Sequence, residues 1–255
     1  MTGGRAFRQP LACDGLGAAL KNELKPWQVK SWCLSKLSAR FVAKMEDVLA
    51  VYQRPHDPKR PVVCLDEKSK ELHATPHGSL TLEPGKPRRE DYEYERNGTR
   101  NLFLWVEPLT GRRQVCVTER RTALDFAEQL KSLVAAYPEA QQVVLVTDNL
   151  NTHSPAALYK AFAPEEARRI AAKIEWHYTP EHGSWLNMAE KELSVLGRQC
   201  LNRRIGDAAT LAREVSAWEV SAWQERRDHT QTAIRWQFTT QDARIKLWRL
   251  YPKTQ

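Results

Sequence analysis

The fold is decided by the stretch Val143-Val144-Leu145-Val146-Thr147-Asp148-Asn149-Leu150-Asn151-Thr152-His153. Its apolar half, three of four residues being valine, is typical of a strand buried on both faces of a sheet. The strand ends on Asp148, and Ser154-Pro155 then supplies a favoured N-cap and first turn for a helix. A strand that ends on a carboxylate at the rim of an open α/β sheet presents that charge to a ligand. An Asx-type turn with no functional role explains this stretch alone equally well.

A second stretch, Val62-Val63-Cys64-Leu65-Asp66-Glu67, repeats the pattern of a short apolar run that ends on carboxylates. Neighbouring side chains of a strand point to opposite faces, so only one of Asp66 and Glu67 can share a site with Asp148. Residues 71–91 follow with three prolines and the basic cluster 86–89, and they are expected to form a loop.

Outward from these two strands, apolar spacing, caps and turn residues predict the remaining elements. Strands are expected over 92–106, 113–118 and 174–179, and helices over 39–52, 122–137, 154–162, 164–173, 208–223 and 241–249. A hairpin followed by strand–helix–strand units gives an α/β fold with a mixed five-stranded sheet and helices on both faces. This is the order of a ribonuclease-H-like fold, with helical N- and C-terminal extensions.

A third source of carboxylates is the helix that follows Thr179-Pro180-Glu181-His182-Gly183-Ser184 and reaches Leu201. Its apolar face is formed by Leu186, Ala189, Leu193, Leu196 and Cys200. Glu190 and Glu192 lie roughly 80° to either side of that face, so periodicity does not choose between them. Two solvated glutamates that flank the apolar face are the alternative without function.

Composition excludes several classes of protein. The 255 residues hold no apolar run near the roughly 20 needed to cross a bilayer, and no secretory signal is found. The five cysteines are scattered without a C-x-x-C pair, which argues against a disulfide framework or a zinc site and favours the cytoplasm. Basic residues exceed acidic ones in 1–60 and 191–255, while the centre is slightly acidic. Basic ends favour a polyanion such as DNA, and an acidic centre favours a divalent cation.

Four ordered motifs resemble the bacterial insertion-sequence transposases of the mariner superfamily, which carry a DDE catalytic triad. The motifs are 64–69, 147–153, 182–190 and 237–247, and the resemblance covers roughly residues 17–252. Carried over by position, it implies Asp66, Asp148 and Glu190 as the catalytic and metal-binding acids, and it selects Glu190 over Glu192. It implies Mg²⁺ or Mn²⁺ as cofactor, with two ions expected.

The same resemblance sets expectations for domains, partners and localisation. Residues 1–54 are expected to hold the remnant of a truncated helical DNA-binding region, around 16–34, and a linker helix. Residues 61–201 would form the catalytic domain, and residues 202–255 a helical extension packed on it. Expected partners are double-stranded DNA (transposon ends and target), a second copy in a homodimer, and an upstream frame product that carries the DNA-binding domain. The expected place of action is the bacterial cytoplasm at the nucleoid, with no membrane.

Further residues are candidates for substrate contact. They are Asn149, His153, His182, Asn187, Arg88, Arg89, Arg203 and Arg204. The arginines are suited to phosphate contacts, whereas His153 has a structural role as its alternative. Two other functions stay open: a non-catalytic or degenerate DNA-binding descendant, and a ribonuclease-H-like nuclease that acts on other nucleic acids.

Overall fold

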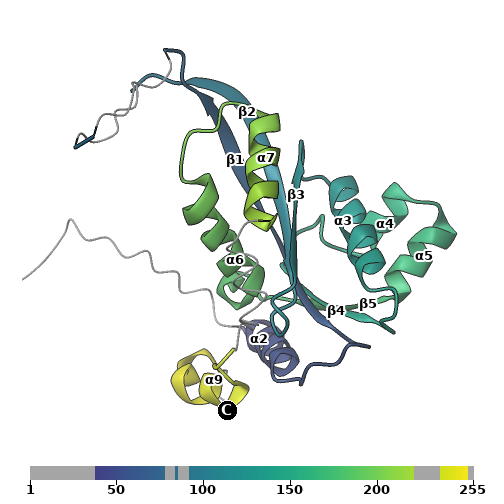
Figure 1. The fold of residues 1–255 in the computed structure, drawn as a ribbon. Coiled ribbons are helices and arrows are strands. Elements are labelled where there is room, and N and C mark those ends of the chain that lie inside the picture. Colours follow the sequence, from purple (N-terminus) through teal and green to yellow (C-terminus); the bar gives the residue numbers. More distant parts are fainter. Residues whose placement is uncertain (1–37, 78–83, 86–91, 221–235, 252–255) are drawn as a thin grey trace, which may run out of the picture. The chain divides into compact units, whose positions relative to one another are not determined.

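The computed structural model describes residues 38–77, 84–85, 92–220 and 236–251 (Figure 1). All of these described residues belong to one compact unit. The helices expected over 16–34, the basic cluster 86–89 and residues 221–223 lie outside the described residues. In the described part, no helix is both long and apolar enough to cross a membrane.

The centre of the described unit is a five-stranded sheet in the order β3-β2-β1-β4-β5. Its strands are β1 (Val62–Ala74), β2 (Glu95–Val106), β3 (Arg113–Thr118), β4 (Val143–Thr147) and β5 (Ile174–Tyr178). The pairs β1–β2 and β2–β3 are antiparallel, and the pairs β1–β4 and β4–β5 are parallel. The mixed sheet expected from the sequence is therefore confirmed.

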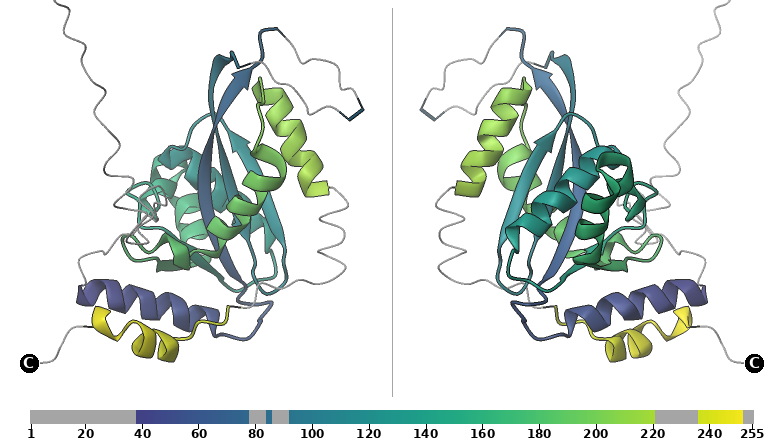
Figure 2. Two further views of the ribbon diagram at one scale, coloured as in Figure 1. Left: turned by 90° about the vertical axis from the view of Figure 1, so that its left-hand side faces the viewer. Right: turned by 90° about the vertical axis from the view of Figure 1, so that its right-hand side faces the viewer.

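Helices cover both faces of the sheet (Figures 1 and 2). On one face α3 (Ala123–Ala136), α4 (Ala156–Ala161) and α5 (Pro164–Ala172) enclose a core with Leu65, Phe103 and Leu145. On the other face α2 (Ala39–Tyr52), α6 (Met188–Leu196) and α7 (Ala208–Val220) enclose a core with Cys64, Leu104 and Val146. The short helix α9 (Thr240–Lys246), followed by a 3₁₀ turn at Trp248–Leu250, contributes Ala243 to this second core.

The structure corrects the expected loop over 71–91, because β1 continues to Ala74. Its outer half pairs with β2 from Lys68↔Leu102 to Ala74↔Glu95, with an irregularity between Glu71 and His73. On one face this part of β1 packs against the chain between α6 and α7, where Leu72 is 1% exposed and the His73 amide donates to the Ile205 carbonyl at 2.8 Å. Lys68, Ser69 and Glu71 are exposed. This part of β1 therefore lacks the apolar alternation by which a strand is recognised in a sequence.

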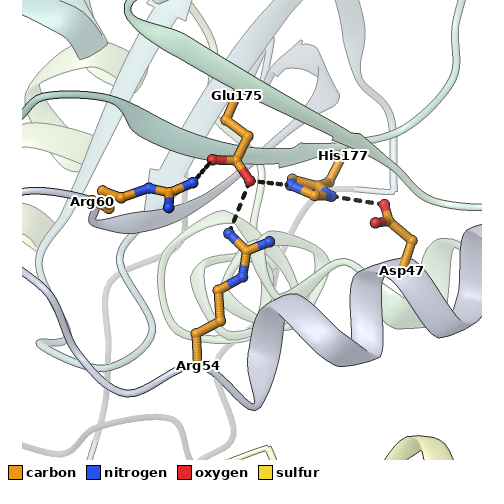
Figure 3. Close-up of polar contacts among 5 residues, drawn as sticks. All are labelled: Asp47, Arg54, Arg60, Glu175 and His177. Carbon is orange, nitrogen blue, oxygen red and sulfur yellow. Dashed lines mark hydrogen bonds and ion pairs between the residues drawn. The ribbon is translucent and has the colours of Figure 1, made fainter.

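Helix α2 shares one hydrophobic core with the sheet, although it belongs to residues 1–54, which were expected to precede the catalytic domain. Met45, Val48 and Leu49 of α2 are fully buried there. A polar network between α2 and β5 holds the helix in place (Figure 3). Arg54 donates to Glu175 at 2.9 Å, His177 lies 3.0 Å from Glu175 and 2.7 Å from Asp47, and Arg60 also donates to Glu175.

Candidate active site

Two aspartates reach the same level of neighbouring strands. Strands β1 and β4 run parallel, and their last paired residues are Cys64 and Val146. Asp66 and Asp148 each lie two residues further along. Because parallel strands advance by nearly the same distance per residue, the two aspartates arrive together where β4 ends.

The faces of the sheet separate Asp66 from Glu67. Cys64 packs in the core beneath α6, and Leu65 packs in the core beneath α3. Side chains alternate along a strand, so Asp66 faces α6 while Glu67 faces α3. The contacts of Glu67 agree, since its Oε2 lies 3.3 Å from Nε2 of His153, which stacks on Phe126 of α3.

The N-terminus of α6 is fixed against β1 beside Asp66. The Asn187 side chain caps α6 by accepting a hydrogen bond from the Ala189 amide at 3.1 Å. Its Nδ2 donates to the carbonyl oxygen of Leu65 at 2.9 Å, and the side chain is 1% exposed. This arrangement differs from the substrate contact expected of Asn187, because both polar atoms are bonded within the fold.

The turn between β5 and α6 is tightly built. The Gly183 amide donates to the Pro180 carbonyl at 2.9 Å, and a Cβ on Gly183 would lie 2.5 Å from Cγ of Pro180. His182 has φ 59°, in the left-handed region that few non-glycine residues adopt. The Tyr52 hydroxyl of α2 then donates to the Leu186 carbonyl at 2.6 Å. These contacts fix the point at which α6 begins.

The two glutamates of α6 occupy different environments. Glu190 lies in the first turn, where the helix dipole favours a carboxylate, and its side chain is exposed. Glu192 is 2% exposed and pairs with Arg113 of β3 at 3.0 Å. Of the two, Glu192 is therefore buried in an ion pair, whereas Glu190 is accessible.

Asp66 and Glu190 line one cavity of about 460 Å³ between β1 and α6. Glu67, Lys68, Ser184 and Ser194 are also part of its lining, so Glu67 contributes to this cavity even though alternation places its side chain toward α3. Burial raises the pKa of Asp66 to about 7, and the charges of Glu67, Asp148 and Glu190 add to the shift. The Glu67 amide, which donates to the Asp66 carboxylate at 2.9 Å, acts in the opposite direction. The carboxylates therefore share one electrostatic environment.

Asp148 is held by a buried histidine. His153 is 3% exposed, and its Nδ1 is hydrogen-bonded to Oδ1 of Asp148. Its other ring nitrogen faces Glu67, and the ring stacks on Phe126 with centroids 4.2 Å apart. His153 was expected to contact substrate, but its burial and these partners give it the structural alternative, that of orienting Asp148.

The other expected contact residues are dispersed. Asn149, which directly follows Asp148, and His182, in the turn before α6, are both exposed. Arg203 pairs with Glu214, and Arg204 donates to the carbonyl oxygen of Glu93 at 2.9 Å. Arg88 and Arg89 lie outside the described residues.

The ligand atoms that this site could offer to a metal ion are carboxylate oxygens. Carboxylates are hard ligands that favour Mg²⁺ or Mn²⁺ over softer metals. Within the described ranges, no three His, Cys, Asp or Glu side chains already surround a common point as metal ligands. Mg²⁺ is usually held by one or two carboxylates together with water and substrate phosphate, so the donor set fits without a preformed cage.

Lys68 is a cavity residue that the sequence analysis did not single out. It follows Asp66 by two positions in β1 and therefore shares its face. Alternation would have indicated Lys68 if the strand had been predicted beyond Glu67.

Fold and site together define a class: ribonuclease-H-like α/β proteins with a carboxylate cluster where the central parallel strands end. A family model described as DDE superfamily endonuclease matches residues 61–212, which is more than half of the chain. The chain belongs to this superfamily, whose enzymes use divalent metal ions. A search of curated proteins gave no match.

Solved structures of similar fold include two complexes of the Mos1 transposase. The Mos1 mariner paired end complex with Mn has a TM-score of 0.54 at 18% identity, over 88% of this chain and 68% of that chain. The Mos1 Strand Transfer Complex has a TM-score of 0.57 at 15% identity, over 94% of this chain and 70% of that chain. At such identities the likeness establishes the ribonuclease-H-like fold.

Proposed function

We propose that this chain is a transposase, which cuts DNA at the ends of an insertion sequence and joins those ends to target DNA. Asp66, Asp148 and Glu190 are its proposed catalytic carboxylates. The observation that supports the proposal is that Asp66 of β1 and Glu190 in the first turn of α6 line one cavity, while Asp148 follows β4, the parallel neighbour of β1. The raised pKa of Asp66, to which burial and the charges of Asp148 and Glu190 contribute, supports it.

The three acids would hold the divalent cation, Mg²⁺ or Mn²⁺, and two ions are proposed. When bound, such ions activate the attacking oxygen and stabilise the charge of the leaving oxygen in an in-line displacement. The protein itself supplies position: Asn187 fixes the first turn of α6, which carries Glu190, and His153 orients the carboxylate of Asp148. Ser184 lines the cavity and can donate a hydrogen bond to a phosphate oxygen.

The partners proposed are double-stranded DNA and a second copy of the chain. The similar Mos1 structures are described as paired end and strand transfer complexes. Bringing two DNA ends together favours a homodimer, and a separate upstream product could supply further DNA binding. Asn149 and His182, both exposed, remain proposed substrate contacts. The proposed place of action is the bacterial cytoplasm at the nucleoid.

A nicking assay tests this function. Supercoiled plasmid and a duplex carrying the element's end would be incubated with the full chain and Mg²⁺ or Mn²⁺. We expect nicking that EDTA abolishes and that Asp148→Asn lacks. Glu165→Gln is the matched control, because Glu165 is an exposed acid of α5 on the other face of the sheet.

Equal cutting by wild type and Asp148→Asn would contradict the proposal. Salt-sensitive DNA binding without metal-dependent cleavage would identify a non-catalytic descendant. Preference for RNA–DNA hybrids over duplex DNA would identify a nuclease of different substrate class.

A further inference from the structure

A second cavity adjoins the one that contains Asp66 and Glu190. Its volume is about 390 Å³, and its lining includes Lys68, Lys70, Ser194, Gly197 and Arg198. Lys68 and Ser194 line both cavities. The two spaces therefore meet side by side between β1 and α6, and together we name them the β1–α6 groove.

The charge of the β1–α6 groove changes along its length. Asp66 and Glu190 line one part, whereas the adjoining part is lined by two lysines and one arginine. Among the described residues that line this second part, none is acidic. Asp66, Lys68 and Lys70 alternate along β1 and so lie on one face, about 6.6 Å apart in successive steps.

The three cations are not equivalent. The Lys70 ammonium is bonded to the carbonyl oxygens of Leu201 and Arg203 at 2.8 and 2.9 Å, so it stabilises the end of the helical segment after α6. Arg198 is exposed and donates to the hydroxyl of Ser194 at 2.8 Å, and both residues line the groove. Lys68 is exposed and has no acidic partner within ion-pair distance in the described part of the chain.

A local feature of the backbone makes room for Lys68. Helix α6 gives way at Gly197 to a π-helical turn, Gly197–Leu201, and such turns are frequent at functional sites. A Cβ on Gly197 would lie 3.2 Å from Nζ of Lys68, so the ammonium lies against the helix backbone. The glycine leaves the ammonium and the groove free of a further side chain.

We infer that the β1–α6 groove binds the sugar–phosphate backbone of the DNA strand adjoining the scissile phosphate, with Lys68 and Arg198 as phosphate contacts. The inference rests on the proposed function and extends it to a substrate-binding surface. A polyanion passing from the carboxylates toward Lys68 and Arg198 exchanges repulsion for attraction. The basic part of the groove therefore holds the strand in register and the acidic part receives the bond to be cut.

The test is the salt dependence of DNA binding by the full chain. The probe is a fluorescent duplex with a single-stranded tail, titrated with protein in Ca²⁺ at several salt concentrations. The slope of log K against log salt is negative, and each phosphate contact that is lost reduces its magnitude by about 0.7 for single-stranded and about 0.9 for duplex DNA. We expect Lys68→Ala and Arg198→Ala each to reduce this magnitude by one such step, and Lys68→Arg to keep the wild-type value.

The matched control is Lys160→Ala with Arg168→Ala, which removes the same charges from exposed positions of α4 and α5 on the other face. This control is expected to keep the wild-type slope. Wild-type slopes in Lys68→Ala and Arg198→Ala, in a protein that still nicks DNA with Mg²⁺, would overturn the groove and leave the proposed function standing. Equal loss of slope in the control would also overturn it, because net charge alone would then explain binding. A wild-type chain that neither binds nor cuts DNA would overturn both.

Discussion

The side-chain amide of Asn187 donates a hydrogen bond to the carbonyl oxygen of Leu65 at 2.9 Å. This contact joins the N-cap of α6 to the residue that precedes Asp66. The helix that carries Glu190 is thereby fixed in register on the strand that carries Asp66. Sequence positions more than one hundred residues apart are brought to one cavity by a buried cap.

Two substitutions of Asn187 distinguish its two hydrogen bonds, the cap on the Ala189 amide and the bridge to the Leu65 carbonyl. Asn187→Ala loses both and is expected to lower the free energy of unfolding by about 1–2 kcal/mol. Asn187→Ser can still cap the helix, but it is too short to reach Leu65. We expect urea denaturation to show that serine recovers most of the stability, while plasmid nicking stays below that of wild type. Wild-type nicking by Asn187→Ser would show that the bridge to Leu65 does not position Glu190.

Substitution of Glu190 is expected to abolish activity with little effect on stability, whereas substitution of Glu192 is expected to lower stability. Glu190→Gln changes an exposed side chain and should alter stability by no more than about 0.5 kcal/mol, yet abolish nicking. Glu192→Ala leaves Arg113 in a buried site without its carboxylate and should cost about 3–5 kcal/mol. Thermal denaturation and nicking of the two variants check this. An inactive, destabilised Glu190→Gln would contradict the separation of roles.

His153 is expected to act through Asp148 and so to alter the metal requirement. His153→Ala removes the hydrogen bond to Asp148, and loss of such an outer partner typically costs about 10–100-fold in metal affinity. The Mg²⁺ concentration for half-maximal nicking should rise by that factor, while saturating Mg²⁺ restores most of the rate. A lowered rate with an unchanged Mg²⁺ requirement would instead place His153 at the substrate.

The network around Glu175 predicts a loss of stability in acid. Partial burial alone would raise the pKa of Glu175, but hydrogen bonds from His177, Arg54 and Arg60 outweigh it and lower the pKa to about 2. Because the pKa of Glu175 is lower in the folded protein than its ordinary value of 4.5, the ionised carboxylate stabilises the fold at pH values above 4.5. That contribution is lost as the pH falls from 4.5 toward 2.

Glu175→Gln is expected to be less stable than wild type at neutral pH, with the difference shrinking over that acid range. Urea denaturation at a series of pH values measures it, and Glu165→Gln serves as the control outside the network. A constant difference across the range would show that the charge of Glu175 makes no contribution.

The apolar strands and the capped helices were predictable because their signals are local. The valine-rich β4 was expected to begin at Val143, and Thr122 was expected to cap α3, where the structure has a capping box with Asp125. The outer half of β1 was missed because its exposed residues carry no apolar alternation. A hairpin followed by strand–helix–strand units was enough to predict a mixed sheet in which the strands before Asp66 and Asp148 belong together.

The roles of side chains near the site were less predictable because they depend on contacts between distant segments. Asn187 and His153 are polar residues next to acids, and the sequence cannot distinguish a solvent-facing position from a buried one. Their partners, the Leu65 carbonyl and the ring of Phe126, become neighbours only in the folded chain. The same holds for Glu192 of α6, whose partner Arg113 belongs to β3.

The central claim is that Asp66, Asp148 and Glu190 bind one set of divalent ions together with DNA. Titration of Mn²⁺ into the full chain with bound duplex, followed by electron paramagnetic resonance of the free ion, tests it most directly. The account predicts saturable binding by wild type and by Glu165→Gln, and weakened binding by Asp66→Asn, Asp148→Asn and Glu190→Gln alike. Wild-type Mn²⁺ binding by all three of these variants would contradict it.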